Sequence, residues 1–170
     1  MLTQPNIYEN HYFKFKIEFP FDWQIRYKSN PSSQLESKAN YQITDDDLPM
    51  EDEDYRTLVF ASRSIRKDSS AFNSKFSMVI HKHIYEYNLQ NELEFKNDII
   101  DVKFGSLHVL NREAQTIEII ENAGSYNSIT KIIAWKEIPD LWCSIYIGGD
   151  SIENFQASEN LLSHLKKVSH

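Results

Sequence analysis

The chain has 170 residues, which is the length of one domain and enough to bury a core without disulfides or metal ions. Its one cysteine, Cys143, excludes an intrachain disulfide and a multi-cysteine zinc site. The net charge of −7 resides in one acidic segment, and no basic stripe is present, so we do not expect nucleic acid as a partner.

The sequence also lacks the marks of export and of membrane insertion. Its first residues contain no basic region followed by an apolar run, and no apolar stretch approaches the roughly 20 residues that cross a bilayer. We therefore expect a cytoplasmic protein that does not bind membranes.

The first predicted element is a strand over residues 12–19. Apolar side chains such as Ile17 alternate there with charged ones such as Lys16, which places the two kinds on opposite faces of a strand. Residues 20–22 contain proline and aspartate and predict a turn, after which a second strand is expected over residues 23–28.

Residues 29–54 form the longest stretch without hydrophobic periodicity. We expect a long acidic loop, inserted between two strands of a single domain that spans residues 1–170. Its acidic run fails the calcium-binding EF-hand pattern, because it lacks a central glycine and contains Pro49. One interpretation is a solvated, self-repelling loop, and the other is docking onto a basic surface of a protein partner. The candidate partner-binding residues are Asp45, Asp46, Asp47, Leu48, Met50, Glu51, Asp52, Glu53 and Asp54.

The middle of the chain predicts two further strands and a helix. The strands lie at residues 55–65 and 75–85, on either side of a turn at residues 68–73. Asn88 is a suitable cap for a helix over residues 89–100, in which leucines and isoleucines form one apolar side.

The second half reads as an antiparallel meander followed by a helix. Its strands, joined by short turns, are predicted at residues 107–110, 116–121, 128–136 and 141–147. After them, Asp150 and Glu153 have the spacing of a capping box for a C-terminal helix that extends to Val168. Clustered strands with helices between and after them predict an α+β fold, with an antiparallel, strongly twisted sheet flanked by helices.

One pattern near the N-terminus consists of Tyr8, Asn10, Phe13, Phe15, Ile17, Phe19, Pro20 and Trp23. Together with the terminal segment 155–168, it resembles the PsbP-like superfamily, which includes the Ran-binding nuclear import factor and bacterial secretion chaperones. The resemblance implies an α/β/α sandwich. It also implies a role in binding rather than catalysis, because the known members bind other proteins or belong to larger complexes.

Few residues suggest chemistry. No nucleophile elbow, phosphate-binding loop or HExxH motif is present, so we predict no catalytic residue and no cofactor. His81 and His83 lie two apart on a predicted strand and share a face, and with His108 nearby they are candidate zinc or nickel ligands. The alternative is an exposed polar strand face. Cys143 is expected to be a small buried hydrophobic residue.

Three functional hypotheses follow. The first is a non-enzymatic protein-interaction module, such as an adaptor, a chaperone or an immunity-type protein, with another protein as its partner. The second is a metal-dependent enzyme or metal-binding protein that uses His81 and His83. The third is a small-ligand-binding protein with a pocket between sheet and helix.

Overall fold

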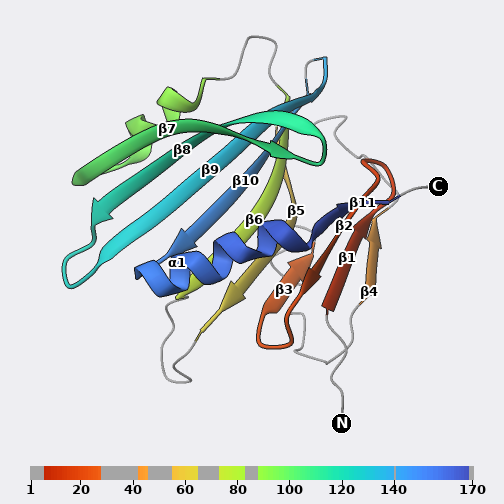
Figure 1. Ribbon diagram of the computed structural model, residues 1–170, viewed down its shortest axis with the longest axis horizontal. Helices are drawn as coiled ribbons and strands as arrows, with labels where there is room; N and C mark the ends of the chain where they lie inside the picture. The colour runs from red at the N-terminus through yellow and green to blue at the C-terminus, as the bar shows by residue number, and fades with distance from the viewer. Residues whose placement is uncertain are drawn as a thin grey trace.

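The computed structural model describes residues 6–27, 42–45, 55–64, 73–82, 88–139 and 141–168. These residues form two β-sheets, one α-helix and two short 3-10 helices. Figure 1 shows a large curled sheet on one side of the molecule and a smaller sheet on the other, with the helix α1 lying across the larger one. None of the helices in this part of the chain has the length and apolar character that a membrane crossing requires.

The smaller sheet has the strand order β11-β2-β1-β4. β1 and β2 form an antiparallel hairpin, β11 pairs antiparallel with β2, and β4 runs parallel to β1. The strands are β1 (Asn6–Asn10), β2 (Phe15–Phe19), β4 (Gln42–Asp45) and β11 (Leu165–Lys167). The segment predicted as an acidic loop over residues 29–54 therefore contains a strand, and its other residues lie outside the described ranges.

The strand predicted over residues 12–19 begins at Phe15, because the chain first turns between β1 and β2. Asn10 supports this turn, since its side-chain oxygen accepts the backbone N–H of Phe13 at 2.8 Å. Lys14 then adopts a left-handed φ of 56°, which carries the chain back into β2. Alternation alone did not reveal the turn, since the alternating pattern continues through it.

The larger sheet is antiparallel throughout and has the order β3-β5-β6-β10-β9-β8-β7. Its strands are β3 (Gln24–Tyr27), β5 (Tyr55–Arg63), β6 (Ser74–Lys82), β7 (Ile99–Val109), β8 (Arg112–Asn122), β9 (Asn127–Ile138) and β10 (Leu141–Gly149). The predicted meander is confirmed, with longer strands than expected. Leu110 and Asn111 join β7 to β8, and both have the positive φ that a two-residue type I′ turn requires.

The main core lies between the two sheets. Most residues of the N-terminal pattern are buried in it, namely Tyr8, Asn10, Phe15, Ile17, Phe19 and Trp23. From the smaller sheet, Phe19 meets Phe76 of β6 edge to face, with ring centroids 5.7 Å apart. Such aromatic contacts bury large apolar areas, so this pair contributes strongly to the association of the two sheets.

A second, smaller core lies on the other face of the larger sheet. It is covered by the 3-10 helix η1 (Leu89–Phe95), which buries Leu89 against Ile117, Ile132 and Trp142. Asn88 caps this helix as predicted, because its side chain accepts the N–H of Gln90 at 2.9 Å.

The helix predicted over residues 89–100 was wrong in type and length. It is a 3-10 helix that stops at Phe95, and β7 begins at Ile99. Asp98 has a φ of 53°, a left-handed conformation that redirects the chain into the strand. The β-branched pair Ile99 and Ile100 favours a strand, although its spacing also suits a helix face.

The C-terminal helix is also shorter than predicted. α1 (Ile152–Glu159) is followed by the 3-10 helix η2 (Asn160–His164), and Leu165 then enters β11. Its cap is Ser151, whose hydroxyl accepts the N–H of Asn154 at 3.2 Å. The predicted cap, Asp150, instead accepts the side-chain amides of Asn73 and Asn154, at 2.7 and 2.6 Å. Strand pairing with β2 ends the helical structure before Val168.

The α+β class and the mainly antiparallel sheets are therefore confirmed. Among the described residues, the helical part is smaller than a full α/β/α sandwich would have, since α1 has eight residues and the opposite face carries the 3-10 helix η1. The described chain is a sheet-dominated domain.

Candidate binding site

The acidic segment predicted to bind a partner falls almost entirely outside the described residues. Asp45 is the last residue of β4, and the candidate positions from Asp46 to Asp54 are not among the described ranges. Their partner-binding role stays a prediction.

The structure separates two of the candidate metal ligands. His81 of β6 is 7% exposed and its Nε2 lies 2.8 Å from the Ser144 hydroxyl, so it is not on an exposed polar face. β7, which carries His108, lies four positions from β6 in the sheet order, roughly 19 Å along the sheet. The expectation that His108 lies near His81 was therefore wrong. His83 lies outside the described residues, so its pairing with His81 stays a prediction. Within the described ranges, no group of three His, Cys, Asp or Glu residues is placed to hold a metal ion.

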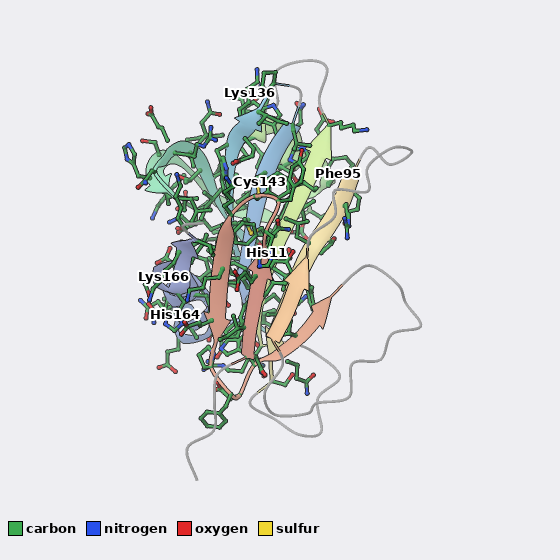
Figure 2. All side chains as sticks on the ribbon, turned by 90° about the vertical axis from the view of Figure 1, so that its right-hand side faces the viewer. His11, Phe95, Lys136, Cys143, His164 and Lys166 are labelled. Atoms are coloured by element: carbon green, nitrogen blue, oxygen red, sulfur yellow. The ribbon has the colours of Figure 1, made fainter. Side chains whose placement is uncertain are left out.

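A cavity of about 270 Å³, here called the hollow, lies between the turn joining β1 and β2, the turn joining β7 and β8, and the end of β11. Buried side chains from both sheets line its inner wall: Phe15, Met78, Trp135 and Cys143. In Figure 2, Cys143 lies in the larger sheet behind the turn that joins β1 and β2. The wall of the hollow is therefore mainly apolar.

The rim of the hollow is charged. Three cations and one carboxylate line it, namely Lys14, Arg112, Lys167 and Glu137. Arg112 Nη2 lies 3.3 Å from Glu137 Oε1, and Trp135 Nε1 donates to Glu137 Oε2 at 2.8 Å. Both oxygens of Glu137 are engaged in this way, so the rim keeps an excess of positive charge. A group with an apolar part and a negative charge is complementary to this arrangement.

The backbone fixes the two lysines at the rim. The carbonyl of Lys14 accepts the N–H of Val168 at 2.9 Å, which attaches the C-terminal segment to the turn between β1 and β2. Lys167 lies opposite Phe15 in the pairing of β11 with β2 and therefore shares its core-facing side. Its neighbour Lys166 points to the other side of the strand and is not among the lining residues.

Cys143 was predicted to be a buried hydrophobic residue, and its burial is confirmed. Burial raises the pKa of the Cys143 thiol well above its usual value, and the negative charge of Glu137 raises it further. The thiol is therefore protonated at neutral pH and is a poor nucleophile.

We expect the Cys143 thiol to react with Ellman's reagent at least about 100-fold more slowly in the folded protein than in denaturant, because the thiolate is disfavoured and the side chain is covered. Absorbance of the released thiolate at pH 7 measures both rates. Rapid stoichiometric labelling of the folded protein would contradict this account of the site.

Sequence reasoning did not find the hollow. Its lining comes from segments far apart in the chain, and none of the residue types is unusual by itself. The available signal was local: Lys14 stands between Phe13 and Phe15, and the alternation over residues 12–19 predicts that it faces solvent.

Two mainly antiparallel sheets packed across an aromatic core, with one short α-helix among the described residues, place this chain among sheet-dominated α+β domains. The solution structure of cyanobacterial PsbP (CyanoP) from Synechocystis sp. PCC 6803 is similar, with a TM-score of 0.50 at 8% identity, over 98% of this chain and 94% of that chain. A crystal structure from Bacteroides thetaiotaomicron VPI-5482 gives a TM-score of 0.46 at 8% identity, over 92% of this chain and 46% of that chain. No protein-family model matches the sequence, and no curated protein matches it either. The fold is PsbP-like.

Proposed function

We propose that this chain is a non-enzymatic protein-interaction module that receives a short segment of a partner protein in the hollow. The observation that carries the proposal is the combination of an apolar wall with a cationic rim in a cavity of about 270 Å³. Pockets for drug-sized ligands commonly measure about 300–1,000 Å³, so this one suits a single large side chain or a small molecule.

The chemistry of the hollow favours binding over catalysis. The Cys143 thiol is held in its protonated form by burial. The Glu137 carboxylate is occupied by Arg112 and by the indole N–H of Trp135. A general base needs a carboxylate or imidazole that reaches a substrate proton, and this one is already engaged on both oxygens.

The partner segment is expected to carry an aromatic or aliphatic side chain next to an acidic residue. Its apolar side chain would pack against Trp135 and Met78, and its carboxylate would lie near Lys14 and Lys167. Hydrogen bonds to charged groups contribute about 1.5–3 kcal/mol each, so the rim contacts are expected to account for much of the specificity.

Selection from a displayed random-peptide library tests the proposal. The wild-type protein is expected to enrich peptides in which an apolar residue adjoins Asp or Glu. Lys167→Glu is expected to weaken their binding at least about tenfold, because a charge-assisted contact is replaced by repulsion. Isothermal titration calorimetry with one enriched peptide measures this difference.

Lys166→Glu is the matched control. It makes the same change in net charge one residue away in β11, with the side chain on the other side of the strand. It is expected to change the affinity about twofold or less, since exposed charges at this range are screened by salt. Equal losses in the two variants would show that the peptide does not bind in the hollow.

A second candidate is a small-ligand-binding protein that uses the same hollow, because its volume and its cationic rim also fit a small organic acid. A thermal-shift screen against small carboxylates separates the two functions. Stabilisation by free carboxylates, with no peptide enriched, would favour the small ligand.

As a separate proposal, the seven acidic residues from Asp45 to Asp54 contact a basic surface of the same partner. Replacing all seven with Asn or Gln should lower the association rate with the partner. Unchanged binding would remove this segment from the interface.

A further inference from the structure

β7 is a long edge strand. It stands at the end of the larger sheet and pairs, among the described residues, with β8 on one side. Figure 1 shows it along the outer rim of the curled sheet. Of its eleven residues, Val109 is buried and the other ten are exposed or partly exposed. An exposed edge strand offers unpaired backbone groups and is a template for pairing with another strand.

The backbone groups of Val102 and Phe104 point away from β8. Val109 and Arg112 flank the two-residue turn and therefore form a hydrogen-bonded pair, and such pairs recur at every second residue of β7 as far as Asp101, beyond which a bulge at Ile100 shifts the register. Val102 falls between them. Its N–H accordingly donates to the carboxylate of its own neighbour Asp101, at 3.0 Å, rather than to β8.

The side chains at the same positions form an apolar row. Val102 lies opposite Ile119 and packs on the smaller core under η1, and Phe104 lies opposite Ile117 of that core. Ile100 and Phe104 are 55% and 57% exposed, respectively. In η1, Phe95 is also exposed, at 80%. Patches of this kind commonly mark protein contacts.

The opposite face of β7 carries Asp101 and Lys103, both exposed and on either side of Val102. Their charged groups lie 4.0 Å apart, a loose contact across two residues of one strand. Exposed charges usually discourage edge pairing. Here they are arranged symmetrically about Val102 and with opposite sign, so one alignment turns them into attractive pairs.

That alignment is antiparallel, with Val102 opposite the partner's Val102. Asp101 then faces the partner's Lys103, and Lys103 faces the partner's Asp101. On the other face the two Val102 side chains meet, and the exposed Phe104 comes to the position of the partner's exposed Ile100. Centring the pair on Phe104 instead would place Asp101 opposite a leucine and Val102 opposite a serine, with no ion pair.

We propose that β7 pairs with β7 of a second copy of this chain, from Ile100 to Phe104, and joins two larger sheets edge to edge in a two-fold symmetric dimer. The outward backbone groups of Val102 match those of the partner's Val102 in this register, as an antiparallel ladder requires. In the dimer, the N–H of Val102 donates to the partner strand instead of to the Asp101 carboxylate. That carboxylate then forms an ion pair with the partner's Lys103. A self-complementary patch is what a two-fold interface needs.

Sedimentation velocity over roughly 1–100 µM protein tests the dimer. The wild-type protein is expected to shift from monomer to dimer with concentration. Asp101→Lys is expected to raise the dissociation constant at least about tenfold, because lysines then face each other at two symmetric positions. The double variant Asp101→Lys with Lys103→Asp restores opposite charges in the same register and is expected to restore the dimer. Circular dichroism confirms that the exposed substitutions leave the fold intact.

Cysteine cross-linking tests the register. Val102→Cys places two thiols opposite each other and is expected to give a disulfide-linked dimer under mild oxidation, while Cys143 stays covered. Ser106→Cys is the matched control, because it is four residues from the symmetry axis and the two thiols would be roughly 27 Å apart. Cross-linking at position 106 but not 102 would overturn the register.

A wild-type protein that stays monomeric throughout the concentration range would overturn the proposal. So would a dimer whose dissociation constant is unchanged in Asp101→Lys, because its interface would then lie elsewhere. These results do not depend on the hollow, so the peptide-binding proposal can fail while the dimer is confirmed, or the reverse.

Discussion

Replacing Phe76 with alanine is expected to lower the free energy of unfolding by about 3–5 kcal/mol. The side chain is fully buried and meets Phe19 edge to face across the interface between the two sheets. Its removal takes away apolar contacts and leaves a cavity that the surrounding strands cannot fill by small movements. In a chain of this length each kcal/mol corresponds to about 2–4 °C in the midpoint of thermal unfolding.

Urea unfolding followed by tryptophan fluorescence measures the loss. Phe21→Ala is the matched control, since Phe21 is 73% exposed in the turn before Trp23 and its truncation should change stability by about 0.5 kcal/mol or less. If the free energy of unfolding falls equally little in both variants, the edge-to-face contact does not hold the sheets together.

Gly149→Ala is expected to have the second large effect. A Cβ at Gly149 would collide with backbone atoms of Asn154 and Phe155 at the start of α1. Backbone atoms cannot rotate away as a flexible side chain can, so the helix must shift from the sheet. Overpacking of this kind costs about 1–3 kcal/mol, and we expect the upper end because the obstacle is backbone.

The neighbouring glycine is the control for this substitution. A Cβ at Gly148 would meet the Ile129 carbonyl oxygen and the Lys75 Cβ at 3.8 Å, which is ordinary van der Waals contact. Gly148→Ala is therefore expected to leave stability within about 0.5 kcal/mol of wild type. Unfolding curves and the helical circular dichroism signal compare the two. Equal stability of both variants would show that α1 does not pack as closely on β10 as the structure indicates.

The strands were predicted well where a single periodicity was present. In β2 the alternation of Phe15, Ile17 and Phe19 with charged residues matches the alternating burial. β6 shows where this reasoning fails, since Val79 and His81 lie on the same face of the larger sheet as Trp142 of the second core and are buried as well. Both faces of a central strand are covered when each carries its own core, and the sequence does not show what lies on the second face.

The helices were predicted less well, and in each case tertiary contacts ended them. Ile99 and Ile100 fit a helix pattern, but pairing with β8 makes them part of a strand. Leu165 fits the pattern of the C-terminal helix, but it pairs with Ile17 of β2 and is therefore part of a strand. Helix periodicity describes which side chains share a face, whereas strand pairing depends on partners far away in the sequence.

The candidate site depends even more than the helices on contacts between residues that are far apart in the sequence. The sequence directed attention to the acidic run at residues 45–54 and to the histidines, because these are concentrated within short segments. The hollow instead combines Lys14, Arg112 and Lys167, which are far apart in the chain. The sheet topology brings these three residues together, so no pattern within a short segment predicts that they lie close to one another.

The sequence by itself determined the class of this protein: an α+β domain with an alternating aromatic strand near the N-terminus and an antiparallel meander. These features follow from local periodicity and from turn chemistry, which short segments contain. The tertiary structure alone decided where the helices end, that His81 is buried away from His108, and that a hollow with a cationic rim lies between the sheets. Burial and strand pairing are properties of surfaces brought together by folding, so they depend on residues that no short segment contains.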